Sequence, residues 1–322
     1  MNFATRYLGL SLRSPFVVGA SPLCDDVDTA RRLQDAGAGA VVMRSFFEEQ
    51  LVGSPNAPTD EELSALPFPE YADYQQSPDH YLAQLAQLKS HLTIPVIASL
   101  NGTHSGAWTD LARRLEQAGA DAIELNFYQV VTDPAIAADQ VELVMLATVG
   151  EVVAAVRIPV AVKLSPFHSS VTQLAVALEL EGANGLVLFN RFYQPDINTD
   201  DLAALPTLRL SDSGELLLRL RWLAILSPQM RGSLAATGGV HTALDAAKAI
   251  LTGADVVQLV SVLLRHGPQV LHTLRKGLEY WMRDHGFDSP GDFRGHLNLS
   301  RCSNPAAFER ANYIRVLQNR RY

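Results

Sequence analysis

Apolar residues recur along the chain in four similar phrases, each a helix end followed by glycine, a small residue and an apolar strand. The phrases are "DAGAGAVVM" (35–43), "QAGADAIEL" (117–125), "LEGANGLVL" (180–188) and "LTGADVVQL" (251–259). Glycine after the last helical turn adopts the left-handed conformation that caps a helix. A nearly continuous apolar run is typical of a parallel strand buried on both faces. The pattern therefore predicts a repeated helix-to-strand unit.

The units between these phrases bring the number of predicted strands to eight. Helical patterns such as "DVDTARRLQDAG" and "SVTQLAVALELEG" place apolar residues three and four positions apart and open on N-cap residues. Eight βα units in 322 residues predict an α/β fold, a (β/α)8 TIM barrel. The alternative is an open doubly wound sheet, which has fewer strands and usually a GxGxxG turn where this chain reads "GASPLCDD". The strands are expected over 15–21, 39–46, 95–102, 121–127, 159–165, 184–190, 233–239 and 255–261.

Two long insertions and a tail extend the minimal barrel. Residues 48–79 follow the second strand and residues 191–219 follow the sixth, so both are expected at the C-terminal mouth, where barrel enzymes carry their sites. Each is interpreted as a lid or a subunit contact, or as a solvated loop. The barrel is assigned to 1–285 and the tail to 286–322, with a helix predicted over 304–318 because Asn304-Pro305 is a good helix start.

Alternation along the predicted strands separates interior side chains from those that face the helices. An interior lysine costs free energy unless it is paired with a charge or bound to an anionic group. Two interpretations of Lys163 follow, an ion pair with Glu124 on the adjacent strand or a contact with a ligand in the mouth. The alternation places Glu124, Asn126, Lys163 and Asn190 inside the barrel, and Val187 and Phe189 outside.

The seventh predicted strand ends in a candidate anion site. Gly238 and Gly239 precede a predicted helix, and their backbone N–H groups would point at an anion there. The eighth strand ends near Ser261. Because the loops after strands 7 and 8 form the phosphate site of many barrels, we expect a phosphate group between them.

Composition narrows the functional classes. The net charge of −8 argues against binding nucleic acid or an anionic membrane surface. The two cysteines form no CxxC motif, which is compatible with a reducing compartment, and no metal site is predicted. No secretory signal is visible and the apolar runs are too short to span a bilayer, so a cytoplasmic protein is expected.

Six motifs in order then resemble the dihydroorotate dehydrogenase family, whose members are FMN-binding (β/α)8 barrels. They are "SPFVVGASPL", "VVMRSFFEEQ", "IELNF", "VAVKLSPF", "ATGGVHTALDA" and "GADVVQLVSVLL", and the resemblance is collinear over about 1–285. The resemblance implies an oxidoreductase of pyrimidine biosynthesis that transfers hydride between flavin N5 and a small dihydro substrate. The short N-terminus is similar to the class 1 branch. The resemblance further implies a small-molecule substrate, a homodimer, and room for an electron-transfer partner protein.

The same resemblance implies roles for particular residues. Lys163 would lie near N1 and C2=O of the flavin and stabilise the negative charge of its reduced form. Arg44, Asn126 and Asn190 would contact the substrate. The cofactor would be bound by Gly19, Ala20, Ser21, Ser45, Asn101, Asn126, Lys163, Asn190, Gly238, Gly239 and Ser261.

The chain departs from the family pattern at the position of the catalytic base. Where the family has cysteine or serine, this chain has Gln129, which has no usable pKa for general base catalysis. The family's substrate loop is replaced by "LSALPFPEY", its glycine motif after strand 6 by "SDSGELLL", and its Gly-Thr on strand 8 by Val260-Ser261. Tyr128 and His168 are the remaining candidates for proton transfer beside Lys163. The chain resembles the dihydroorotate dehydrogenase-like branch that lacks the catalytic cysteine or serine.

Three other functions stay open at this point. An interior lysine can form a Schiff base, so Lys163 also fits a lyase. A metal site built from His104, His168 and His241 is less favoured, because no HxH motif or carboxylate cluster accompanies them. A barrel that binds flavin as a non-catalytic subunit or sensor would explain the missing base.

Overall fold

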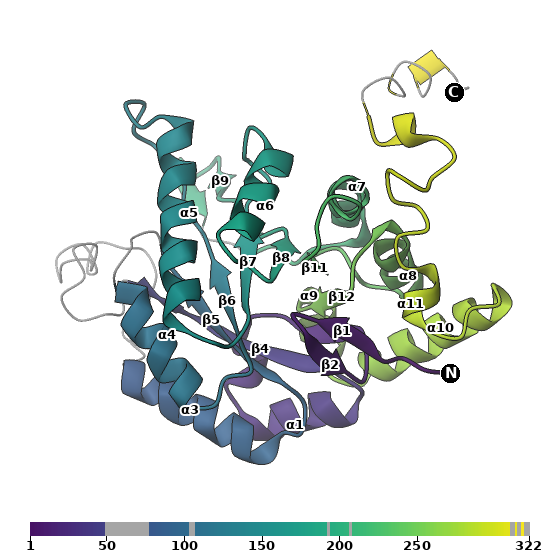
Figure 1. Cartoon of the computed structure of the whole chain (residues 1–322), viewed down its shortest axis with the longest axis horizontal. Helices are drawn as coiled ribbons and strands as arrows, with labels where there is room; N and C mark the ends of the chain where they lie inside the picture. Colours follow the sequence, from purple (N-terminus) through teal and green to yellow (C-terminus); the bar gives the residue numbers. More distant parts are fainter. Residues whose placement is uncertain are drawn as a thin grey trace.

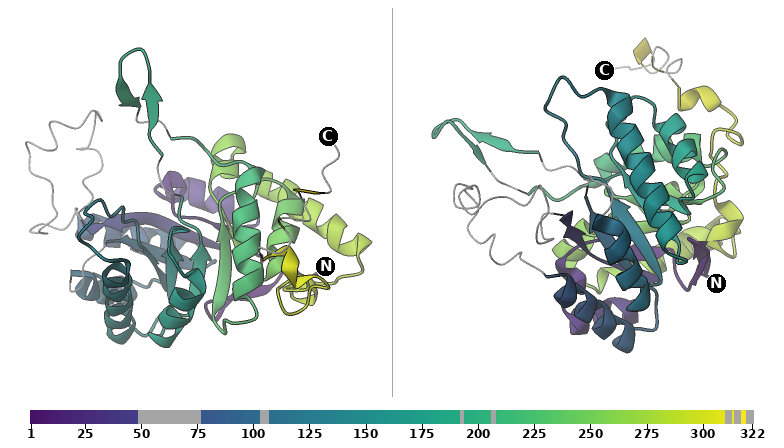
Figure 2. Two further views of the ribbon diagram at one scale, coloured as in Figure 1. Left: turned by 90° about the horizontal axis from the view of Figure 1, so that it is seen from above. Right: turned by 60° about the vertical axis from the view of Figure 1, so that its left-hand side comes forward.

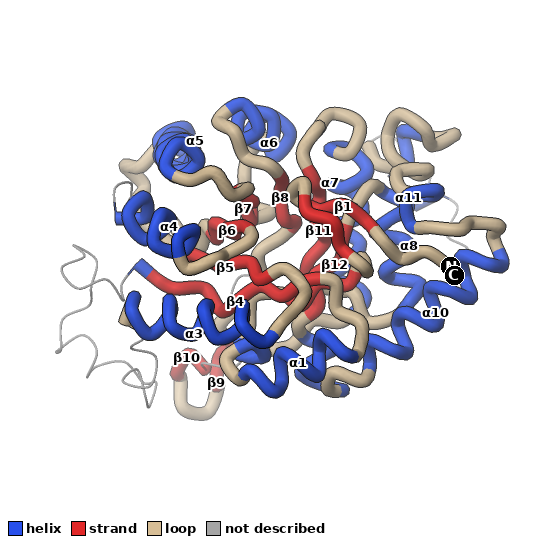
Figure 3. The backbone as a smooth tube through the Cα atoms, turned by 60° about the horizontal axis from the view of Figure 1, so that its bottom comes forward, coloured by secondary structure: helices blue, strands red, loops and turns tan. Residues whose placement is uncertain are grey.

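Eight parallel strands close into a barrel in the computed structural model of the chain, with helices around it (Figure 1, Figure 3). The structure describes residues 1–48, 77–102, 107–191, 194–205, 208–309, 313 and 317–318. Most of the predicted insertion 48–79 therefore lies outside the described residues. The strand order is β11-β12-β3-β4-β5-β6-β7-β8, so the (β/α)8 barrel is confirmed.

Seven barrel strands fall inside their predicted ranges, and β4 extends one residue beyond its range of 39–46, to Phe47. The strands are β3 (Phe16–Val18), β4 (Ala40–Phe47), β5 (Val96–Asn101), β6 (Ala122–Asn126), β7 (Val160–Leu164), β8 (Gly185–Leu188), β11 (Ser233–Thr237) and β12 (Val256–Leu259). All are parallel to their neighbours, and they are buried because helices cover the outside of the barrel.

The helices between the strands begin and end where the sequence pattern predicts. Asp26, Ser170 and Thr242 each accept a hydrogen bond from a backbone N–H of the first turn. Positive φ angles at Gly37 and Gly253 supply the left-handed caps. Within the described residues, no helix has both the length and the hydropathy that a bilayer crossing requires. The helices are α1 (Val27–Asp35), α3 (Pro78–His91), α4 (Ala107–Gln117), α5 (Ala138–Ala155), α6 (Val171–Leu180), α7 (Leu216–Leu226), α8 (Ala243–Thr252), α9 (Ser261–His266), α10 (Val270–Asp284) and α11 (Pro290–Phe293).

An N-terminal hairpin that the sequence analysis did not predict lies at the amino ends of the barrel strands. Its strands are β1 (Thr5–Tyr7) and β2 (Leu10–Leu12). The backbone N–H of Leu8 donates to Ser233 Oγ at the start of β11 (2.9 Å). Tyr7, Leu8 and Leu12 pack with the apolar residues of the barrel interior, so the hairpin closes the end opposite the mouth.

The strand register confirms three predicted interior residues and corrects one exterior residue. Glu124, Asn126 and Lys163 face the interior, as their hydrogen bonds and ion pair show. Val187 was predicted outside, but it pairs with Lys163 across β7 and β8 and packs with the interior cluster. The prediction was wrong because it counted alternation back from Asn190, whereas β8 ends at Leu188.

The second insertion is shorter than predicted. The start of the predicted tail helix also differs from the prediction. Helix α7 begins at Leu216, inside the range 191–219. The insertion contains the hairpin β9 (Asp196–Asn198) and β10 (Ala203–Leu205), which projects away from the barrel (Figure 2). At the predicted tail helix, Pro305–Ala307 form a single 3-10 turn and the Asn304 side chain makes no cap hydrogen bond. Most of the remaining tail lies outside the described residues.

The close approach of strands β3 and β4 depends on a glycine before β4. A Cβ atom on Gly39 would overlap the backbone carbonyl of Ser14, which cannot turn aside as the end of a flexible side chain can. We therefore expect Gly39→Ala to lower the free energy of unfolding by about 1–3 kcal/mol through overpacking. Chemical denaturation measures this. Gly291→Ala is the control, because its Cβ would meet Ser289 Oγ at an ordinary 3.6 Å, and equal losses in both variants would contradict the account.

Candidate active site

Lys163 lies inside the barrel near the mouth, on β7 beside β6. Its side chain is 9% exposed, and Nζ lies 3.6 Å from Glu124 Oε1. That distance makes an ion pair but exceeds the range of an N–H···O hydrogen bond. Among the described residues Nζ has no hydrogen-bond partner, so its three N–H donors are available to a ligand. The structure is therefore compatible with both sequence-based interpretations of Lys163, the ion pair with Glu124 and a contact with a ligand in the mouth.

A chain of hydrogen bonds links polar side chains from three strands, β4, β5 and β6, and from the segment after β8 at the mouth. Ser99 Oγ and Ser45 Oγ are 2.8 Å apart, and Asn126 Nδ2 donates to Ser45 Oγ (3.4 Å). Asn190 Nδ2 donates to Asn126 Oδ1 at 2.6 Å. Asn101, at the end of β5, pairs with Asn126 in the strand register. The structure thus brings together residues that lie far apart in the sequence.

The segment after β3 forms the edge of the mouth next to β12. The backbone N–H of Gly19 donates to the Leu259 carbonyl (3.0 Å), and Ser21 Oγ donates to the Gly19 carbonyl (2.9 Å). A Cβ on Gly19 would lie 2.9 Å from Val260, so no larger residue fits without a shift of that side chain. Ala20 packs against the interior cluster. The three residues predicted to line the cofactor therefore share one small-residue edge.

The glycine pair after β11 adopts left-handed backbone conformations, with φ of +82° at Gly238 and +83° at Gly239. A Cβ on Gly238 would lie 3.0 Å from the guanidinium of Arg219, and one on Gly239 would overlap the backbone of Leu216. Arg219 is buried and donates to the carbonyls of Thr237 (2.9 Å) and Glu215 (2.8 Å). Helix α7 thus holds the loop in place.

Ser211, which the sequence analysis did not single out, connects the two predicted phosphate loops. Its N–H donates to Ser261 Oγ (3.1 Å), and its own Oγ accepts from the Gly239 N–H (3.4 Å). The same Oγ lies 3.1 Å from His241 Nε2. Ser211 is buried, so Gly239, Ser261 and His241 form one polar cluster around it. Its position in an insertion of irregular sequence left no periodic signal that would identify it.

Arg44 on β4 is held beside the loop that follows β3. Its guanidinium forms an ion pair with Asp25, and its backbone carbonyl accepts a hydrogen bond from Tyr81 Oη (2.9 Å). Burial raises the pKa of the Asp25 carboxyl, although Arg44 opposes that shift. To bind a substrate as predicted, the Arg44 guanidinium would have to contact the substrate while it is paired with Asp25, or leave Asp25.

The segment after β6 carries the departure from the family pattern. Tyr128 is half-buried and Gln129 is exposed, immediately beyond Asn126 at the mouth. The Tyr128 side chain is thus less exposed to solvent than that of Gln129. Of these two residues, only Tyr128 carries a group able to give or take a proton.

His168 follows β7 and turns toward the helix layer. Its Nδ1 lies 3.7 Å from Glu142 on α5, and its Nε2 is buried without a hydrogen-bond partner among the described residues. His104 lies outside the described residues, and within the described part of the chain no group of three potential metal ligands occurs. His168 and His241 occupy separate clusters, one on α5 and one on Ser211.

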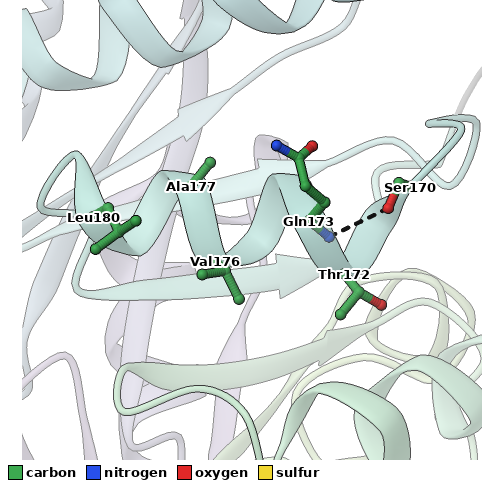
Figure 4. A pocket seen from close by; sticks show the side chains of 6 residues that line it. All are labelled: Ser170, Thr172, Gln173, Val176, Ala177 and Leu180. Atoms are coloured by element: carbon green, nitrogen blue, oxygen red, sulfur yellow. Dashed lines mark hydrogen bonds between the residues drawn. The ribbon is translucent and has the colours of Figure 1, made fainter.

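A separate depression of about 420 Å³ lies on the outside of α6 (Figure 4). It is lined by Ser170, Thr172, Gln173, Val176, Ala177 and Leu180. None of these side chains is titratable, and the buried face of α6 consists of other residues such as Leu174 and Leu178. This depression therefore offers no side chain for general acid–base catalysis.

Two partly buried histidines are expected to make the folded state sensitive to acid. Burial lowers the pKa of His168, and burial together with Arg265 lowers the pKa of His241, although nearby carboxylates oppose both shifts. Unfolded histidine has a pKa of about 6.5, so the unfolded state binds more protons below that pH. We expect the melting temperature to stay constant above about pH 6.5 and to fall progressively as the pH is lowered below that value.

His168→Gln should flatten this decline, which thermal unfolding between about pH 8 and about pH 5.5 measures. His80→Gln, at an exposed position at the start of α3, is the matched control and should keep the wild-type slope. An identical acid slope in His168→Gln and in the wild type would show that His168 does not contribute.

Comparison with known proteins identifies the family of the chain. The family model described as dihydroorotate dehydrogenase matches residues 2–282. The chain is 26% identical over 318 residues to the NAD-dependent dihydropyrimidine dehydrogenase subunit PreA of Escherichia coli K12, covering 92% of this chain and 77% of that protein. It is 29% identical over 306 residues to a putative dihydroorotate dehydrogenase A (fumarate) of Aeropyrum pernix, covering 90% and 95%.

A third relative is the catalytic subunit of dihydroorotate dehydrogenase B (NAD(+)) of Methanothermobacter thermautotrophicus. It is 25% identical over 298 residues, which cover 90% of this chain and 97% of the relative. The family match spans the whole barrel, from the N-terminal hairpin through most of α10. The chain belongs to the dihydroorotate dehydrogenase family.

Proposed function

We propose that the chain is an FMN-dependent oxidoreductase that acts on the saturated C–C bond of a dihydropyrimidine ring. Membership of the family supports an oxidoreductase. The single observation that carries the proposal is the buried ammonium group of Lys163, which donates no hydrogen bond to the described residues and lies at the mouth beside Asn126 and Asn190.

The residues present fit a flavin. An isoalloxazine ring presents carbonyl oxygens and ring nitrogens along one edge, and it requires donors and acceptors at fixed positions. Asn126 and Asn190 each use only part of their amide hydrogen-bonding capacity in their mutual bond. Lys163 supplies the cation, and the small residues Gly19 and Ala20 leave the neighbouring edge without bulky side chains. The donor set and the small-residue edge are those that a flavin needs.

Lys163, Asn126, Asn190 and Ser45 would hold the ring edge, with Asn101 and Ser21 at its margins. Gly238, Gly239 and Ser261 would hold the phosphate group, where Ser211 already contacts Gly239 and Ser261. FMN, when bound, supplies the hydride acceptor for the dehydrogenation. The residues of the chain bind and orient the cofactor, and Lys163 places a positive charge beside it.

Two observations support the proposed substrate class, the names of the relatives and the amide side chains at the barrel mouth. PreA is named for dihydropyrimidine and the other two relatives for dihydroorotate. The amides of Asn126 and Asn190 can bond the carbonyl and N–H groups of such a ring. Because Gln129 cannot remove a proton, we assign that task to Tyr128, with His168 as the other candidate. Arg44 can bind a substrate carboxylate if its pair with Asp25 opens.

A second candidate function is a non-catalytic flavin-binding subunit or sensor. The observation that favours it is the exposed Gln129 at the position of the family's base. The names of two relatives describe subunits, so we also propose that this chain exchanges electrons with a partner protein. A lyase with a Schiff base on Lys163 is less well supported, because the ion pair with Glu124 keeps that amine beside a carboxylate.

Anaerobic reduction of the FMN-loaded protein separates these functions. Dihydrouracil, dihydroorotate, NADH and NADPH are mixed with it in turn, and dithionite serves as the control that the flavin is reducible. We expect a dihydropyrimidine to bleach the flavin absorbance. If dithionite bleaches it but no dihydropyrimidine and no nicotinamide nucleotide does, the enzymatic proposal fails in favour of the non-catalytic subunit.

A further inference from the structure

A layer of polar side chains lies above an apolar floor in the described barrel interior. Glu124, Lys163 and Gln258 form the layer, on β6, β7 and β12. A buried ion pair is often no more stable than apolar side chains of similar volume, so stability alone does not explain this layer. The floor beneath it is lined by Val17, Ala40, Val42, Ile97, Ala122, Ala161, Val187, Ala235 and Val256.

Glu124 is held in one orientation by its two neighbours. Its side chain is 1% exposed. Gln258 Nε2 donates to Oε2 at 2.6 Å, while Oε1 has no hydrogen-bond partner among the described residues and lies 3.6 Å from Lys163 Nζ. The carboxylate is thus anchored through one oxygen, and the other oxygen is directed at the ammonium group without a hydrogen bond to it.

A fourth polar side chain near this layer, that of Tyr7, does not share the charge. The Tyr7 hydroxyl is buried below Glu124 and has no hydrogen-bond partner among the described residues. Burial, followed by the charges of Glu124 and Asp255, raises the pKa of Tyr7 well above its ordinary value, although the nearby Gln258 side chain opposes that shift. Tyr7 therefore stays neutral, and the positive charge that faces Glu124 in this layer is that of Lys163.

We infer that Glu124 is a positioning residue that determines how much of the charge of Lys163 acts on the cofactor at the mouth. The inference rests on the proposed function, because it requires FMN beside Lys163. A negative charge behind the ammonium group partly cancels its field in the interior, where charges are weakly screened. The carboxylate thus opposes the gain of negative charge by the flavin and lowers its midpoint potential.

The test is the midpoint potential of the bound FMN, measured anaerobically against reference dyes, in wild type and Glu124→Gln. The amide keeps the size and the contact to Gln258 but removes the charge. We expect a shift to more positive potential. Glu124→Asp, which restores a carboxylate, should lie closer to wild type. Tyr7→Phe is the matched control from the same buried region, and it should leave the potential unchanged because it removes no charge.

Gln258→Leu gives a second measurement that does not depend on how well Glu124→Gln folds. Without the amide donor, the carboxylate charge is less neutralised and acts more strongly on Lys163, so the potential should move downward. Unchanged potentials in both FMN-loaded variants would overturn the inference while leaving the proposed function intact. A wild-type protein that binds no FMN would overturn both.

Discussion

Lys163→Met is expected to weaken FMN binding about tenfold to hundredfold, because it removes a charged hydrogen-bond donor worth about 1.5–3 kcal/mol. The same variant leaves Glu124 as a buried carboxylate without its counter-charge, since Nζ lies 3.6 Å from Oε1 in the wild type. We therefore also expect the free energy of unfolding to fall by about 3–5 kcal/mol. Fluorescence titration with FMN and chemical denaturation measure the two effects.

The double variant Lys163→Met with Glu124→Gln separates these effects. It removes both charges, so most of the lost stability should return, because a neutral pair of similar volume needs no counter-ion. The loss of FMN affinity should remain, since no donor replaces the ammonium group. Wild-type FMN affinity in the double variant would show that Lys163 neutralises Glu124 and does not contribute to FMN binding.

Reduction of the bound flavin by dihydroorotate is expected to be about 10²–10⁴-fold slower than in a class 1 enzyme measured alongside, because Gln129 cannot act as general base. Dithionite should reduce both proteins equally well, because the residues proposed to bind the flavin are retained. Stopped-flow absorbance under anaerobic conditions gives both rates.

Equal rates with dihydroorotate would contradict this expected difference and would mean that Tyr128, or His168 in its place, removes the proton as efficiently as the family's base. Tyr128→Phe and His168→Ala would then identify it. A large loss in Tyr128→Phe alone would point to the hydroxyl next to the mouth. A large loss in His168→Ala alone would require the ring to leave Glu142, from which it is 3.7 Å distant in the structure.

The barrel could be predicted from the sequence because short stretches of neighbouring residues determine its repeated helix-to-strand unit. Glycine caps such as Gly37 and apolar runs such as that of β12 depend on neighbouring residues only. The interior position of Lys163 followed from alternation within one strand. Alternation failed at Val187, because the prediction extended β8 past Leu188, and strand ends depend on hydrogen bonds to other strands.

Residues whose role depends on distant partners were missed. Gln258 donates to Glu124 across 134 positions, although a single polar residue in the apolar run "ADVVQLV" was a usable signal. The hairpin that carries Tyr7 was also signalled, by the alternation around Leu8-Gly9. Ser211 lies in an irregular segment, where no periodicity links sequence to position. The predicted roles of the site residues remain proposals, because they concern a cofactor and not the fold.

The flavin content of the purified protein tests the central claim most directly. The protein is precipitated with acid, and the released cofactor is identified by chromatography and quantified by absorbance. The account predicts yellow protein with FMN at about one equivalent per chain, because one lysine and one phosphate loop serve one cofactor. A colourless protein that also fails to bind added FMN in an equilibrium titration would contradict it.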